Sequence, residues 1–449
     1  MGRAGKIKRA FIDANAGIAF GYAIVLVRNL AAPDILAATD FSVFWSAWHM
    51  ILHGHAAGLY DEAAQRATQR LVLDGGYFEG GLMAFLNPPH FALATVAFGW
   101  LADRAGGQLA FAAWTAVNLA LLAALVRMLW DEWGADTRQH RWMLTVAILA
   151  FYPVFTSIKN GQPSLVLALA VLGVHRAAKA GRDWIGGGWL TVLTIKPQLV
   201  PAVAIFLVAR RCWRLLAAAA ALTAGVMAAT TLALGANVWI EYLRHVHYLE
   251  QFWGSGTPEY MLNFRGALLR VVGLGHQASI ERVAVAAWLA AMALIAVVLW
   301  RRRIDESDDA RPAYAFAIAL GLLSNPHLFM HDTVIWTVPL LLCAASMRDA
   351  GAAWATFAIF ALAWPAIFLV AGRLDIRSGP LTWLDLHTWS FIAATVMIAR
   401  ALAAEHASRS TTIGSTRDDQ IADHGLIGAK REPNTEVAPH FVQNATRTL

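Results

Sequence analysis

The residues of this sequence most able to do chemistry are ionisable side chains at the edges of long apolar segments. Asp40 is the first of them, since it follows the apolar segment 11–30 and precedes the aromatic-rich run Phe41–Trp45. A carboxylate in such a place can act as a general base that takes a proton from a hydroxyl group. The structural alternative is that Asp40 caps a helix that begins at Phe41. The sequence leaves both roles open.

Positively charged side chains, with neighbouring amides, form a second group that suits phosphate binding. They lie in the motifs KNGQ, IKPQ and NFRG, and the residues concerned are Lys159 and Gln162, Lys196 and Gln198, and Asn263 and Arg265. Each lysine interrupts an apolar run at an expected helix boundary, where it can bind an anion or extend towards water. Arg265 can clamp a phosphate with two hydrogen bonds, or it is a solvated loop arginine.

The segment 324–332 carries the densest group of titratable side chains. It contains His327, His331 and Asp332 between two apolar segments. Two histidines four residues apart share a face of a helix, as metal ligands do, but no HExxH motif or cysteine cluster accompanies them. Hydrogen bonding of these side chains to a phosphate or a sugar is therefore favoured over metal binding.

The elements that position these residues are expected to be membrane helices. Of the 449 residues, 58% are hydrophobic and only 15% are charged, too few charges to cover a water-soluble protein of this size. Apolar stretches of about 20 residues recur, and each is long enough to cross the hydrocarbon core as a helix. The net charge of +6 is spread over short loops, which excludes a nucleic-acid-binding role. No nucleotide-binding motif is present.

Clusters of Lys and Arg between the apolar segments set the expected topology, because positive loops face the cytoplasm. The result is an all-α polytopic membrane protein with both termini in the cytoplasm, as expected of the inner membrane of a cell. Its roughly twelve crossings are predicted near 11–30, 108–126, 142–158, 162–178, 184–196, 198–210, 214–235, 283–300, 312–325, 331–347, 351–371 and 386–402.

The same scheme predicts how the remaining segments are arranged. Segment 88–102 does not cross and is expected to be re-entrant or interfacial. Two extracytoplasmic segments, 31–89 and 235–281, carry further helices that cover an outer cavity, and every candidate residue named above is expected on that side. One domain covers 1–402. The polar tail 403–449 is expected to be disordered.

The order of the motifs TDFSVFWSAW, GxxxGLYD, NPP, KNGQPSLV, TIKPQLV, NFRG and SNPHLFMHD resembles glycosyltransferase family 87, of the GT-C superfamily, over about residues 10–400. The resemblance implies an inverting transfer of a sugar, commonly mannose, from a polyprenyl-phosphate carrier to a lipid or glycan acceptor on the outer face. Asp40 matches the family's catalytic aspartate. One of His327 and His331 matches its functional histidine, and the polar loop positions match Lys159, Gln162, Lys196 and Gln198. No metal or other cofactor is expected.

Two other functions fit a polytopic protein with polar outer residues. A transporter or lipid flippase would place ionisable residues at mid-membrane depth in broken helices, whereas here they cluster at outer helix ends. A scaffolding subunit would tolerate replacement of those residues without loss of activity.

Overall fold

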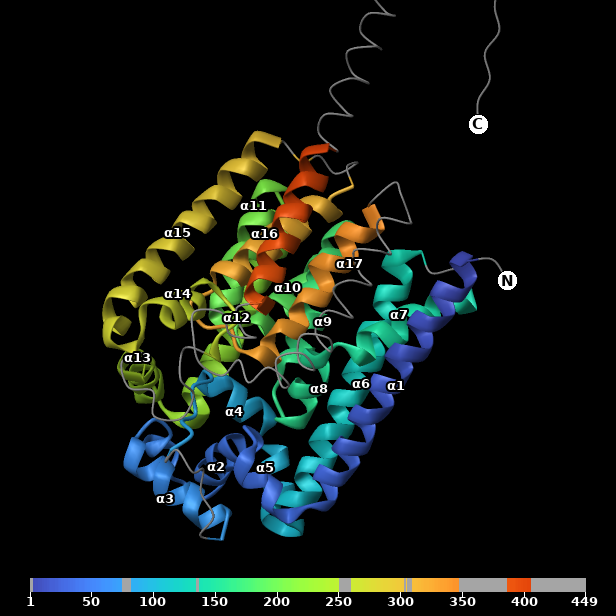
Figure 1. Cartoon of the computed structure of the whole chain (residues 1–449). Coiled ribbons are helices and arrows are strands. Elements are labelled where there is room, and N and C mark those ends of the chain that lie inside the picture. The colour runs from blue at the N-terminus through green and yellow to red at the C-terminus, as the bar shows by residue number, and fades with distance from the viewer. Residues whose placement is uncertain are drawn as a thin grey trace, which may run out of the picture. The chain divides into compact units, whose positions relative to one another are not determined.

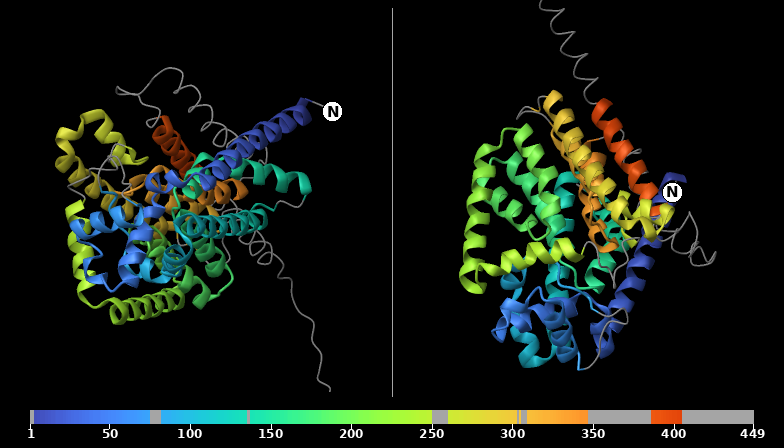
Figure 2. Two further views of the ribbon diagram at one scale, coloured as in Figure 1. Left: turned by 90° about the horizontal axis from the view of Figure 1, so that it is seen from below. Right: turned by 90° about the vertical axis from the view of Figure 1, so that its left-hand side faces the viewer.

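Helices form every regular element of the part of the chain that the structure describes. The computed structural model describes residues 3–74, 82–134, 137–249, 260–302, 304, 309–346 and 386–404, which contain α- and 3₁₀-helices and no strand (Figures 1 and 2). Contacts divide the chain into Met1–Leu402 and Ala403–Leu449. The predicted all-helical class is confirmed, whereas residues 405–449 of the predicted disordered tail lie outside the described residues.

Five helices are long and apolar enough to cross a membrane. They are α1 (Arg3–Ala31), α6 (Gly107–Trp133), α12 (Trp213–Leu234), α15 (Gln277–Arg302) and the helix Leu386–Ala404. Figure 1 shows α1 and α15 on opposite sides of the helical bundle. Large apolar side chains on these helices are exposed, including Phe20 at 68%, Leu232 at 89% and Trp300 at 73%. Such surfaces are stable in lipid and not in water, so the chain is a membrane protein.

A sixth candidate span is bent. It consists of α7 (Arg138–Ala150) and α8 (Tyr152–Lys159), which meet at an angle of 56°. Between them Phe151 has an extended backbone, and Pro153 follows in the first turn of α8. Proline donates no backbone hydrogen bond and its ring clashes with the preceding turn, so one straight helix cannot continue through it.

The predicted count of about twelve crossings is not confirmed, because several of them are helices of 16 residues or fewer. These are α9 (Ser164–Lys179), α10 (Asp183–Leu193), α11 (Val200–Ala209), α16 (Arg311–Ser324) and α17 (Thr337–Ser346). The 16 residues of α9 extend about 24 Å, less than the roughly 30 Å hydrocarbon core. Most of them are buried by other helices. The predicted crossing 351–371 lies outside the described residues.

The segments predicted to lie outside the membrane are themselves largely helical. Segment 31–89 contains η1 (Pro33–Ala38), α2 (Phe41–Leu52), η2 (Ala56–Gly58) and α3 (Glu62–Val72). Segment 88–102 gives α4 (Pro89–Thr95) and α5 (Ala97–Ala105), and segment 235–281 gives α13 (Asn237–Leu249), α14 (Phe264–Val272) and η5 (Leu274–His276). With seven and nine residues, α4 and α5 are each too short to cross the core. Aromatic side chains of α2, α4 and α6 form an apolar core of their own, separate from the larger core of the protein, and hold these helices together.

Charged loops and polar motifs lie at opposite ends of the bundle. At the C-terminal end of α9, Arg176 pairs with Asp131 at 3.3 Å and with Glu132 at 3.6 Å, and Arg311 Nη1 donates to the Glu132 carbonyl at 3.3 Å. Charged residues from the ends of α6 and α9 and from the start of α16 thus meet at one end. Ser164, at the other end of α9, lies among the polar motif residues that form the candidate site.

Candidate active site

A tight turn after α8 carries the KNGQ motif and positions its amide. Gly161 has the left-handed backbone (φ +73°) that ends α8, and a Cβ there would approach the Phe41 Cβ to 2.9 Å. Only glycine fits both demands. Trp114 Nε1 donates to the Gly161 carbonyl at 2.7 Å, and Gln162 N donates to the Ser157 carbonyl at 2.9 Å. These bonds direct the Gln162 side chain towards the start of α2.

The carboxylate of Asp40 faces this turn. Gln162 Nε2 donates to Asp40 Oδ2 at 2.7 Å, and the backbone joins the same segments where Phe41 N donates to the Asn160 carbonyl at 3.2 Å. Asp40 immediately precedes α2, yet its side chain makes no capping hydrogen bond to that helix. The capping interpretation is therefore wrong. The Gln162 amide holds one oxygen of the half-buried carboxylate, which therefore faces the turn and not the backbone of α2.

A second carboxylate, at the start of η6 (Met330–Trp336), gathers residues from two further segments and from η6 itself. Asp332 is 1% exposed, and its Oδ1 accepts hydrogen bonds from Ser164 Oγ at 2.7 Å and from Lys196 Nζ at 2.5 Å. Its Oδ2 lies 3.6 Å from His331 Nε2. Lys196 therefore does not extend freely into water but ends in a buried ion pair. Asp332 fixes the lysine ammonium group and the histidine ring next to each other.

The loop between α16 and η6 is held in place by its own polar groups and by the NFRG region. Asn325 Oδ1 accepts from His327 N at 2.9 Å, and Leu262 N donates to the Leu328 carbonyl at 2.9 Å. Asn263 Nδ2 donates to the Asn325 carbonyl at 2.7 Å. The Asn263 amide, predicted to bind substrate, is thus used to fix this loop.

The two imidazoles of this loop have different surroundings. Burial, followed by the positive charge of Lys196, lowers the pKa of His327 to about 3, so this ring is neutral at physiological pH. His331 lies within electrostatic range of both Asp332 and Asp40, which links the two carboxylates of the site. The structure thus brings both predicted histidines near Lys196 and Asp332, and His331 near enough to Asp40 for an electrostatic interaction.

The NFRG motif begins α14, and each end of the motif has a structural role. Asn263 Oδ1 accepts from Gly266 N at 2.8 Å and so caps the helix. A Cβ on Gly266 would overlap the Met261 carbonyl, so only glycine fits there.

Arg265, between these two positions, is almost completely buried. It is 2% exposed, which makes the solvated-loop interpretation wrong. Nη1 donates to the Pro326 carbonyl at 3.3 Å and Nη2 lies 3.8 Å from Glu281 Oε1. Nε and Nη2 are buried without a hydrogen-bond acceptor in the described part of the chain. Buried guanidinium donors without acceptors are suited to an anion supplied by a ligand.

Three residues of this region remain to be described. Two of them were predicted to bind substrate, and the third was not predicted. Lys159 ends α8, and Gln198 lies in η3 (Pro197–Leu199). Neither side chain bonds or ion-pairs with another residue that the structure describes. Ser164 was not predicted, although it stands two residues after Gln162 within KNGQPSLV. A hydroxyl group at the first position of a buried helix was the available signal.

Together these contacts gather a carboxylate and positively charged side chains at one end of the bundle. Asp40 is oriented by Gln162, while Lys196 and Arg265 supply positive charge and His327 supplies a neutral ring. This set matches a displacement in which a hydroxyl loses its proton and an anionic group departs.

Comparison with known proteins gives one match. The model of glycosyltransferase family 87 matches residues 85–329, more than half of the chain. The matched range includes Gln162, Lys196 and Arg265, whereas Asp40 and Asp332 lie outside it and contact it in space. No curated protein and no solved structure matches the chain.

Proposed function

Because this chain belongs to glycosyltransferase family 87 and is a membrane glycosyltransferase, we propose that it moves a sugar from a polyprenyl-phosphate carrier to a lipid or glycan acceptor. The proposed sugar is mannose or a similar sugar. The proposed place is the extracytoplasmic face of the cell membrane, with both termini in the cytoplasm. The grouping of basic loops at the opposite end of α9 supports this orientation.

The contact between Asp40 and Gln162 carries the proposal. It joins a carboxylate outside the matched range to a polar turn inside it, at 2.7 Å. The carboxylate is not used to cap α2, and it lies within electrostatic range of His331. An oriented carboxylate next to a cationic cluster is what transfer from a phosphate carrier requires.

The proposed reaction is a single displacement with inversion. Asp40 takes the proton of the acceptor hydroxyl, whose oxygen attacks the anomeric carbon from the face opposite the carrier. The new carbon–oxygen bond forms as the bond to the phosphate oxygen breaks, and the phosphate leaves with the electron pair. A phosphate leaves without an acid, so one carboxylate suffices, unlike glycoside hydrolysis, which uses two.

The remaining residues take two kinds of role in this proposal. Lys196 and Arg265 stabilise the negative charge that grows on the departing phosphate, assisted by hydrogen bonds from His327 or His331. Lys159, Gln162 and Gln198 complete the polar lining around the donor. Asp332, Ser164 and Asn263 act through other residues: the first two hold Lys196 and His331, and Asn263 fixes the loop of His327.

The test is transfer of radiolabelled sugar by the purified protein in liposomes. A panel of polyprenyl-phosphate sugars, with mannose first, is offered with membrane lipids as acceptors, and the anomeric configuration of the product is determined. We expect transfer from at least one carrier, with inverted configuration. A product of retained configuration would overturn the single displacement. Movement of the intact carrier across the bilayer without any transfer would overturn the glycosyltransferase proposal in favour of a flippase.

A further inference from the structure

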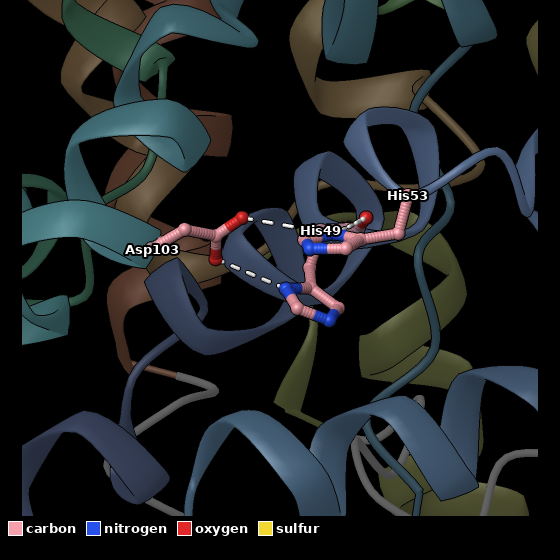
Figure 3. Close-up of side chains that lie close together, drawn as sticks. All are labelled: His49, His53 and Asp103. Atoms are coloured by element: carbon pink, nitrogen blue, oxygen red, sulfur yellow. Dashed lines mark hydrogen bonds and ion pairs between the residues drawn. The ribbon is translucent and has the colours of Figure 1, made fainter.

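A second polar cluster lies between α2 and α5, away from the proposed active site. His49 lies in the last turn of α2, His53 directly follows that helix, and Asp103 lies near the end of α5; Figure 3 shows its carboxylate facing both rings. His49 Nδ1 is 3.0 Å from Asp103 Oδ1, and His53 Nδ1 is 3.7 Å from Oδ2. One ligand atom of each residue lies within 4.8 Å of the others. We propose that these three side chains bind a divalent transition-metal ion of the Zn²⁺ class, which joins α2 to α5.

The distances between the ligand atoms fit such an ion. Ligands at roughly 2.0–2.1 Å from a tetrahedral Zn²⁺ ion lie about 3.4 Å from one another. The separations of His49 Nδ1 from Asp103 Oδ1 and of His53 Nδ1 from Asp103 Oδ2, 3.0 Å and 3.7 Å, fall on either side of that value. Small side-chain rotations therefore bring the three groups around one ion. Two imidazoles and one carboxylate also form a ligand set that zinc and its neighbours in the transition series accept.

Close packing of α2 against α4 and α5 holds the three ligand residues in place without an ion. Gly99 lies one turn before Asp103 on α5, and a Cβ on it would overlap the Trp48 side chain of α2. Trp48 Nε1 also donates to Thr95 Oγ1 at 2.9 Å, which ties α2 to the end of α4. Since Trp48 immediately precedes His49, this close packing fixes the helix faces that carry the ligands. Sites built on rigid helices need little reorganisation to bind an ion.

The two imidazole rings lie against each other. The rings of His49 and His53 stack with centroids 3.9 Å apart, so both must turn about their side-chain torsions for their nitrogens to converge on one ion. Neutral imidazole is the form that binds metal. His53 Nδ1 also lies 2.9 Å from the His49 carbonyl, and binding of an ion by Nδ1 would replace that contact.

The cluster lies too far from Asp40 to take part in the proposed sugar transfer. His49 follows Asp40 by nine residues along α2, a rise of about 14 Å in a helix. The proposed ion is therefore structural, and its binding does not rest on the proposed function.

The test is Zn²⁺ binding by the full-length protein in detergent, purified with an affinity tag that contains no histidine. Titration calorimetry gives stoichiometry and affinity for the wild type and for the variants His49→Ala, His53→Ala and Asp103→Asn. The matched control is His55→Ala, because His55 is exposed and only two residues from His53. Thermal midpoints of all variants are measured without and with Zn²⁺.

We expect one saturable site per chain, retained in His55→Ala and weakened at least about 10-fold in each ligand variant, by analogy with the loss seen when groups around a metal are removed. Zn²⁺ should raise the thermal midpoint of the wild type and of His55→Ala only. Asp103→Asn preserves side-chain shape and hydrogen bonding, so it gives the result if a histidine variant fails to fold. No saturable binding, or equal binding in control and ligand variants, would overturn the proposal.

Discussion

Replacing Lys196 by methionine should destabilise the protein far more than loss of an exposed charge would. Methionine has a similar length but leaves the Asp332 carboxylate, which is 1% exposed, without its cation. Breaking a buried ion pair from one side costs about 3–5 kcal/mol. Ser164 Oγ still donates to the carboxylate, so we expect the lower end, about 3 kcal/mol.

Removing both charges together separates stability from activity. In Lys196→Met combined with Asp332→Leu no buried charge is left unpaired, and such apolar replacements are often neutral or stabilising. The hydroxyl of Ser164 loses its acceptor, at a cost of about 1 kcal/mol, and His331 loses its neighbouring carboxylate. Sugar transfer should nevertheless stay about 10²- to 10³-fold slower, because the cation that faces the departing phosphate is gone.

Thermal unfolding in detergent, followed by tryptophan fluorescence, and the transfer rate are measured on the same preparations. Lys159→Met is the matched stability control, since it removes a lysine without an ion pair to any described residue, and we expect a change within about 0.5 kcal/mol. If Lys196→Met unfolds like the wild type, the ion pair does not stabilise the fold as described. If the double variant transfers sugar at the wild-type rate, Lys196 does not stabilise the departing phosphate.

Three further changes test other parts of the site. Gln162→Leu removes the donor to Asp40, and because a hydrogen bond to a charged group contributes about 1.5–3 kcal/mol, kcat should fall about 10- to 100-fold. Gly266→Ala forces a methyl group onto a backbone carbonyl and should lower stability by about 1–3 kcal/mol in thermal unfolding, whereas Gly225→Ala, with no atom within 4 Å, should not. His327 has a pKa of about 3 when folded and an ordinary value of 6.5, so the unfolded chain binds more protons between these values and stability falls as pH drops from 6.5 towards 3. His327→Gln should therefore lose less stability than the wild type between pH 6.5 and pH 5, and an equal loss would contradict the burial argument.

The residues of the candidate site could be predicted because charged groups are costly beside apolar helices. Asp40, Lys196 and Asp332 each interrupt or border an apolar run, and charge parity placed them on one side of the membrane. The structure pairs Lys196 with Asp332 and joins Asp40 to Gln162. Their pairing was not predictable, since the ion pair of Lys196 with Asp332 joins positions 136 residues apart, one just before η3 and the other in η6.

The number of membrane crossings could not be predicted for a different physical reason. A helix such as α9 is apolar because other helices bury it, and α12 is apolar although most of its residues are not buried by protein. Composition does not distinguish a protein neighbour from a lipid one. The Asp103 cluster was missed as well, although the spacing of His49 and His53 by four residues was visible in the sequence.

The most direct test of the account is the rate of sugar transfer by Asp40→Asn. Asparagine keeps the shape of the side chain and can still accept the hydrogen bond from Gln162, but it cannot take a proton. Asp61→Asn is the control, because Asp61 caps α3 and asparagine caps equally well. We predict that Asp40→Asn binds the donor but transfers sugar about 10²- to 10⁴-fold more slowly, whereas Asp61→Asn is unchanged. Transfer by Asp40→Asn at close to the wild-type rate would contradict the role of Asp40 as the base.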